Sequence, residues 1–165
     1  MNEKELARPE KVVSLDEKDK QILRELQRDG RVSLTSLAKK LDVAIDTVKA
    51  RIERMKKTKI LHVGAFIEPR IIGYPLVADV KIKLNNNSQE QTEAFISFLR
   101  SHARVIDLLS LMGDYDFTCV MIAKSTEDLD KVSQEIRQKF KGIIADWRGF
   151  LILKTYKFEE YTLND

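Results

Sequence analysis

Two helical stripes of apolar residues, separated by only three residues, constrain the N-terminal half of this chain most strongly. The first stripe has the i, i+3, i+4, i+7 spacing of one helix face and consists of Leu34, Leu37, Ala38 and Leu41. The second stripe begins after residues 42–44 and consists of Ile45, Val48, Ile52 and Met55. Helices this short cannot each bury an apolar face alone, so they must pack together. Two helices joined this closely have the spacing of a helix-turn-helix.

An earlier helical pattern completes a unit of three helices. It runs over residues 17–29, and Asp16 is a suitable N-cap for it. Its apolar face consists of Ile22, Leu23 and Leu26. Ser33 is placed to cap the second helix in the same way. The sequence therefore predicts a winged-type helix-turn-helix over residues 15–60.

The excess of positive over negative charge is confined to this unit. Residues 16–59 carry 13 Lys or Arg against 8 Asp or Glu, whereas residues 60–165 carry 13 against 15. Such an asymmetry favours a polyanionic partner for the N-terminal half. A charged face that is merely solvated is one alternative, and a three-helix packing unit that binds no DNA is another.

The later helix of a helix-turn-helix enters the major groove, so the surface opposite its apolar stripe is the expected recognition surface. Thr47 and Ala50 suit a thymine methyl group, and Arg51 or Arg54 suits a guanine edge. Asp46 either favours the helix dipole or accepts from cytosine N4. The candidate DNA-contacting residues on this helix are Asp46, Thr47, Lys49, Ala50, Arg51, Arg54 and Lys57.

Phosphate contacts are expected from two sources. Lysines such as Lys49 and Lys57 suit phosphate oxygens. Thr35 and Ser36 lie in the first turn of the second helix, where the side chains and the helix N-terminus together bind anions.

The C-terminal half follows the order β-α-β-β-α-β. Its alternating or β-rich segments are residues 76–84, 104–112, 115–123 and 143–154. One helix opens at Ser88, with Gln91 at the capping-box position, and the other opens at Ser125. This order predicts a ferredoxin-like domain, and the fold class of the whole chain is α+β.

Four antiparallel strands under two helices leave one face of the sheet uncovered. In a domain this small, the sheet of a second copy is the natural cover, so we expect at least a dimer. A monomer with a solvated polar sheet face is the alternative, which the apolar run of residues 150–153 disfavours.

Several classes of protein are excluded by what the sequence lacks. No apolar run reaches the roughly 18–20 residues that span a bilayer, and the charged N-terminus does not resemble a signal peptide. We therefore expect a cytoplasmic protein without a membrane partner. Because Cys119 is the only cysteine and His62 and His102 are far apart, we expect no metal site and no cofactor. No phosphate-binding loop or nucleophile motif occurs, so the chain is predicted not to be an enzyme.

A pair of carboxylates, Asp114 and Asp116, flanks Tyr115. Such a pair could perform acid–base chemistry or bind a metal. An Asp in a tight hairpin more often satisfies the backbone of the turn, and we expect this role for Asp114.

The motifs of both halves together resemble the Lrp/AsnC (feast/famine) family of transcription regulators over about residues 15–160. In the N-terminal half the matching residues are Leu15–Asp16, Asp19, Ile22–Leu23, Leu26–Gln27, Gly30–Arg31, Ser33, Leu37–Ala38, Val48, Arg51–Ile52 and Ile60. In the C-terminal half, residues 113–116 (Gly-Asp-Tyr-Asp) lie between the middle strands, where the family has its Gly-Asx-Tyr-Asp motif.

The resemblance implies a DNA-binding regulator. Members bind double-stranded, pseudo-palindromic promoter DNA, pair a linker strand between subunits, dimerise sheet to sheet and join into even-numbered assemblies. Here the β-rich residues 61–67 are the expected linker strand. Amino acids often bind family members near the hairpin turn, and a carboxylate there suits an ammonium group. The implied effector-binding residues are Gly113, Asp114, Tyr115 and Asp116.

The turn before the third helix departs from the family pattern, which often has Gly followed by Ser. Asp42 takes the first place, and Asp tolerates the left-handed conformation better than most residues. Ala44 takes the second place and forfeits a side-chain N-cap.

Five segments follow from these inferences. They are a tail at residues 1–14, the helix-turn-helix at 15–60, a linker strand within 61–75, a ferredoxin-like oligomerisation and effector domain at 76–158, and a tail at 159–165.

Two other functions remain open. Sirohaem decarboxylases resemble the same architecture and act on a tetrapyrrole, for which they need basic and histidine residues between the domains. A pure assembly module would bind neither DNA nor a ligand, and its behaviour would not depend on Arg51 or Arg54.

Overall fold

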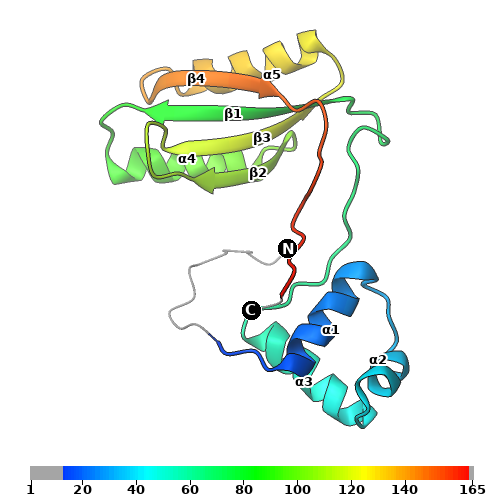
Figure 1. The fold of residues 1–165 in the computed structure, drawn as a ribbon. Helices are drawn as coiled ribbons and strands as arrows, with labels where there is room; N and C mark the ends of the chain where they lie inside the picture. Colours follow the sequence, from blue (N-terminus) through cyan, green and yellow to red (C-terminus); the bar gives the residue numbers. More distant parts are fainter. Residues whose placement is uncertain (1–12, 164–165) are drawn as a thin grey trace. The chain divides into compact units, whose positions relative to one another are not determined.

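The computed structural model describes residues 13–163, which divide into two compact units (Figure 1). Unit 1 contains the residues up to Phe66 and those from Lys157 onward, whereas unit 2 is Ile67–Tyr156. The predicted N-terminal tail lies outside the described residues, except for Val13 and Ser14. Among residues 13–163, no helix has both the length and the apolar character needed to cross a membrane.

Unit 1 is built on three helices: α1 (Glu17–Arg28), α2 (Leu34–Leu41) and α3 (Ile45–Lys57). The predicted apolar stripes meet in one core, and its buried members are Ile22, Leu23, Leu37, Ala38, Leu41, Val48, Ile52 and Met55. Each helix alone is too short to be stable in water, so this shared core holds the three together.

The turn between α2 and α3 has the conformation that the sequence predicts. Asp42 is left-handed at φ 52°, and the Val43 N–H donates to the Ala38 carbonyl oxygen at 3.1 Å. These features end α2 in the manner of a left-handed helix cap. Ala44 begins α3 without a side-chain hydrogen bond, as expected.

The predicted linker strand over residues 61–67 was wrong for the single chain, because no strand is present there. A strand requires a neighbour that pairs with its backbone groups, and no part of the described chain pairs with this segment. Several of its apolar side chains are exposed, among them Val63, Phe66 and Ile67.

Unit 2 contains one antiparallel sheet with the strand order β2-β3-β1-β4. Its elements along the chain are β1 (Leu76–Leu84), α4 (Gln89–Ser101), β2 (Val105–Ser110), β3 (Phe117–Ala123), α5 (Thr126–Lys139) and β4 (Ile144–Leu151). The order confirms the ferredoxin-like prediction. The outer strands are shorter than predicted, since β2 ends two residues before Met112 and β4 ends three residues before Lys154.

Helices α4 and α5 cover one face of this sheet. Phe95 of α4 is fully buried, and its ring centroid lies 5.0 Å from that of Phe140 and 6.2 Å from that of Phe117. Cys119 is buried in the same core, and burial raises the pKa of its thiol to about 12.

Within residues 67–156, no element covers the opposite face of the sheet. A polar cluster lies on it, in which the Thr118 hydroxyl donates to Asp79 and the Lys81 ammonium lies 2.7 Å from the Asp79 carboxylate. Phe150 and Leu109 on this face leave 56% and 51% of their surface exposed. We call this surface the open sheet face.

Candidate nucleic-acid interface

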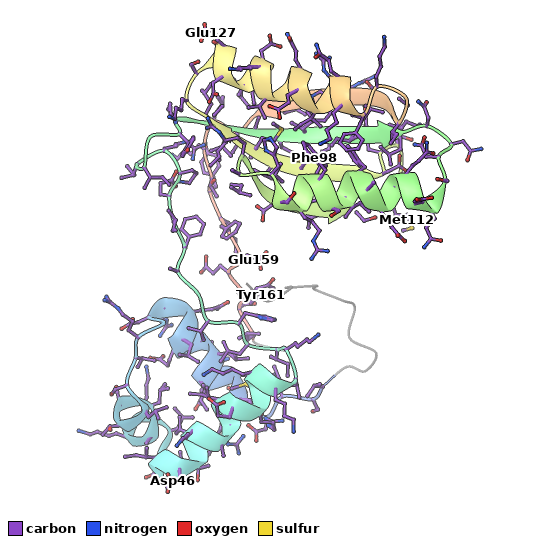
Figure 2. All side chains as sticks on the ribbon, turned by 180° about the vertical axis from the view of Figure 1, so that it is seen from behind. Asp46, Phe98, Met112, Glu127, Glu159 and Tyr161 are labelled. Carbon is purple, nitrogen blue, oxygen red and sulfur yellow. The ribbon has the colours of Figure 1, made fainter. Side chains whose placement is uncertain are left out.

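The surface of α3 opposite the unit 1 core is exposed. Asp46 lies at the start of the helix, as Figure 2 shows. The predicted residues that are exposed on α3 are Asp46, Thr47, Lys49, Ala50, Arg54 and Lys57. Thr35 and Ser36 are exposed on the first turn of α2, where the Ser36 N–H donates to the Ser33 hydroxyl oxygen.

The Arg51 side chain extends from α3 to the start of α1. Its guanidinium donates to the Asp16 carboxylate at 2.6 Å and to the Asp19 carboxylate at 2.9 Å. Arg54 also donates to Asp19, which is buried with 1% of its surface exposed. Two arginines of α3 therefore converge on one carboxylate of α1.

The same carboxylates cap α1. The Asp16 side chain accepts from the Asp19 N–H, and the Asp19 side chain accepts from the Asp16 N–H, so the two form a capping box. The Asp19 N–H and the Arg51 guanidinium lower the pKa of Asp16, while Asp16 and Asp19 raise the pKa of Arg51. The network thus joins the start of α1 to the middle of α3.

Sequence reasoning missed this network. Asp19 was given only as a residue that matches the family, and Arg51 was given as a candidate base contact. The available signal was the spacing of Asp16 and Asp19 at a helix start, together with the position of Arg51 at the edge of the apolar stripe of α3.

A surface hollow lies beside α3, and its lining carries both signs of charge. It is lined by Ser14, Asp16, Asp19, Asp46, Thr47, Ala50, Arg51 and Arg54. The positive charge beyond it is concentrated in the last turn of α3, at Lys56 and Lys57, and continues at the left-handed Lys59. Thr47 and Ala50 offer a small contact surface, and the lysines offer phosphate contacts.

The second predicted site is the hairpin between β2 and β3, where Met112 projects from the turn (Figure 2). Gly113 has φ +145°, a conformation that favours glycine. Asp116 closes the turn through its backbone, because its carbonyl oxygen accepts from the Leu111 N–H at 2.8 Å. Its carboxylate accepts from the Leu84 N–H at the end of β1 at 2.7 Å. The turn-satisfying role expected for Asp114 was wrong, and the hairpin carboxylate that binds backbone is Asp116, whose partner lies on β1.

Asp114 is exposed and makes no hydrogen bond or ion pair within residues 13–163. Tyr115 instead donates from its hydroxyl to Asp146 at 3.3 Å, and Arg148 lies 5.9 Å from its ring centroid. Partial burial raises the pKa of Tyr115. Asp146 and Arg148 of β4 are thus neighbours of the hairpin that the sequence did not indicate.

The site geometry does not support the alternative in which the chain acts on a tetrapyrrole through histidine residues. His62 belongs to unit 1 and is exposed, whereas His102 belongs to unit 2 and accepts from the Arg104 N–H through Nδ1. No cluster of His, Cys, Asp and Glu suited to a metal ion occurs among the described residues.

Two family models match the chain. The AsnC-type helix-turn-helix domain matches residues 15–56, and the Lrp/AsnC ligand binding domain matches residues 77–161. Together they cover α1–α3 except for Lys57, and all the strands and helices of unit 2 except for Leu76.

Curated relatives are similar over most of the chain. The HTH-type transcriptional regulator AldR of Mycolicibacterium smegmatis is 31% identical over 71% of this chain and 69% of its own length. The HTH-type transcriptional regulator FL11 of Pyrococcus horikoshii is 28% identical over 88% of this chain and 93% of its own length.

Solved structures share the fold. A transcriptional regulator of Neisseria meningitidis in complex with L-Met has a TM-score of 0.81 and 19% identity, covering 92% of this chain and 98% of its own. E. coli AsnC has a TM-score of 0.78 and 22% identity, covering 90% and 99%.

Asp19→Ala should destabilise unit 1 by about 1–3 kcal/mol. The substitution removes half of the capping box and leaves Arg51 and Arg54 without their buried carboxylate. Amide hydrogen exchange of α1–α3 during a urea titration measures this loss. Glu53→Ala is the matched control, because Glu53 pairs with Lys56 on the exposed surface and contributes less than about 0.5 kcal/mol. Equal stability of the two variants would contradict the role assigned to Asp19.

Proposed function

Because the chain belongs to the Lrp/AsnC family of transcription regulators, we propose that α3 reads a specific promoter sequence and that a small molecule bound to unit 2 modulates this binding. The chain is a DNA-binding transcriptional regulator with a ligand-binding domain. Its relatives are regulators rather than enzymes. No observation favours the tetrapyrrole alternative.

The exposed surface of α3 is the observation that carries the DNA proposal. Thr47 and Ala50 present small side chains with methyl groups, which suit the edge of a thymine. Lys49 and Lys57 flank them with exposed ammonium groups that suit phosphates. Thr35 and Ser36 add a helix N-terminus that suits a further phosphate, and Asp46 is positioned to accept from a cytosine amino group.

The two arginines have different roles in this proposal. Arg51 bonds to both Asp16 and Asp19 and keeps only 25% of its side chain exposed, so it acts as a positioning residue that orients α3. Arg54 keeps 44% of its side chain exposed, so it contacts DNA while one of its nitrogens remains paired with Asp19.

Two substitutions on α3 separate phosphate contact from base contact. Lys57→Ala should weaken binding to promoter and unrelated duplexes alike and reduce the salt slope by about 1, because it removes one phosphate contact. Thr47→Ala should weaken only specific binding, by about 1 kcal/mol, because it removes one methyl contact with thymine. The measurement is a gel-shift titration on the DNA upstream of the protein's own gene at two salt concentrations.

Lys131→Ala is the matched control for this experiment, since Lys131 is an exposed lysine on α5 in unit 2. It should bind DNA as the parent does. Absence of a specific shift by the parent protein at either salt concentration would refute the proposal.

We further propose that the effector is an amino acid bound at the hairpin of Gly113, Asp114, Tyr115 and Asp116. One support is the regulator of Neisseria meningitidis, whose structure is a complex with L-Met. The other is Asp114, whose exposed carboxylate has no partner in the described chain and suits an ammonium group. In this proposal, the Asp116 carboxylate ties the hairpin to the end of β1. The Tyr115 hydroxyl, bonded to Asp146, forms one side of the binding site.

Asp114→Asn should weaken binding of the amino acid about tenfold, because the charge-assisted hydrogen bond to the ammonium group is lost. Isothermal calorimetry with L-methionine, followed by the other amino acids one at a time, gives the affinity. Asp130→Asn on α5 makes the same chemical change away from the hairpin and should bind as the parent does. Unchanged affinity of the Asp114→Asn variant would exclude this carboxylate from the site.

We propose, finally, that the open sheet face pairs with that of a second copy, which would bury Phe150 and Leu109. Phe150→Lys should then shift the parent dimer toward the monomer in sedimentation equilibrium, because an unpaired ammonium is costly in an apolar interface. Ser97→Lys adds the same charge on the exposed side of α4 and should leave the dimer intact. A parent protein that sediments as a monomer would contradict the proposed pairing.

A further inference from the structure

Residues 158–163, here called the C-terminal strap, return to unit 1 after the whole of unit 2. We propose that the strap is a regulatory clamp on α1, which gives the DNA-binding unit a second connection to the ligand-binding domain and thereby strengthens DNA binding. This inference rests on the proposed DNA-binding function. The model of the ligand binding domain reaches residue 161 and so includes most of the strap, whereas the structure places the strap in unit 1.

Gln27 of α1 recognises the backbone of the strap. Its side-chain Nε2 donates to the Tyr161 carbonyl oxygen at 2.8 Å, and its Oε1 accepts from the Tyr161 N–H at 2.9 Å. One side-chain amide thus makes the two hydrogen bonds that a neighbouring strand makes with one residue of an antiparallel ladder. Both hydrogen bonds can form only in one alignment of the strap, so the contact between Gln27 and Tyr161 is specific.

A second contact secures the end of the strap. Arg24, one helical turn before Gln27, donates to the Leu163 carbonyl oxygen at 2.9 Å. The Leu163 side chain packs against the unit 1 core. Leu163 also has φ 53°, a conformation that Leu rarely adopts without surrounding contacts that hold it.

The start of the strap is secured by aromatic rings. Phe158 packs on Phe66, the last residue of the first segment of unit 1, with ring centroids 5.3 Å apart. The Tyr161 hydroxyl donates to Glu159 at 2.6 Å; both residues are labelled in Figure 2. The strap is therefore held at Phe158, at Tyr161 and at Leu163.

The bound strap shortens the tether between the two units. Ten residues separate Leu151, the end of β4, from Tyr161, so this connection spans at most about 35 Å. Fifteen residues separate Leu61, which packs on the unit 1 core, from Leu76, the start of β1, and this connection spans up to about 50 Å. Release of the strap leaves only the longer connection, so the DNA-binding unit gains conformational freedom that DNA binding must remove.

The strap lies away from the proposed DNA contacts. Gln27 is on the side of α1 opposite Glu25, whose carboxylate pairs with Lys40 of α2 at 2.7 Å. None of the proposed contact residues of α2 and α3 has a hydrogen bond to the strap. Loss of the strap should therefore change DNA affinity without removing a phosphate contact.

Gln27→Ala in the full chain tests this inference, together with a chain that ends at Lys157. Gln21→Ala is the matched control, because Gln21 is an exposed glutamine on the same helix. We expect the Tyr161 amide to exchange about tenfold faster in Gln27→Ala than in the parent or the control. We also expect Gln27→Ala and the shortened chain to bind promoter DNA about fivefold more weakly, with an unchanged salt slope.

Two results would overturn the inference. One is a Tyr161 amide that exchanges equally fast in Gln27→Ala and in Gln21→Ala, which would show that the Gln27 side chain does not hold the strap. The other is equal DNA affinity of the parent, Gln27→Ala and the shortened chain while exchange shows that the strap is released. A failure of the DNA-binding proposal is distinct, because the parent itself would then not bind DNA while the exchange measurement would still report on the strap.

Discussion

The DNA-binding unit depends on the ion pairs of the buried Asp19 carboxylate. A carboxylate removed from water must find charged or hydrogen-bonding partners, and here Arg51 and Arg54 supply them from α3. Apolar packing alone fixes which faces of the helices meet, but it allows neighbouring helices to slide and rotate by small amounts. The paired arginines restrict that freedom, so the orientation of the exposed surface of α3 is set by a residue of α1.

Much of the fold could be predicted because the sequence agrees with it locally at several levels. The stripe of Leu34, Leu37, Ala38 and Leu41 predicts both the existence of α2 and its buried face. Asp42 marks the turn through its tolerance of the left-handed conformation. In unit 2, the capping box of Ser88 and Gln91 fixes the start of α4. Each of these signals is confined to a few neighbouring residues, which is why a single sequence reveals it.

The features that escaped prediction depend on residues distant in sequence. Arg51 looks like any exposed arginine on a helix until the fold brings Asp16 to it from 35 residues away. The turn carboxylate was assigned to Asp114, since nothing local shows that Asp116 is the one that reaches the Leu84 N–H. The strand expected over residues 61–67 failed for a related reason, because β-rich composition does not provide a partner strand.

The return of the C-terminal strap also has a consequence for synthesis. A ribosome makes the three helices first, then the 67–156 segment, and only afterwards the residues that complete unit 1. At ordinary elongation rates this interval lasts about 5 to 20 s. During that time Gln27 and Arg24 lack the backbone that they bind in the finished protein. The DNA-binding unit is thus the first part of this chain to emerge and the last to mature, and a nascent chain acquires its complete form only after the ligand-binding domain has been made.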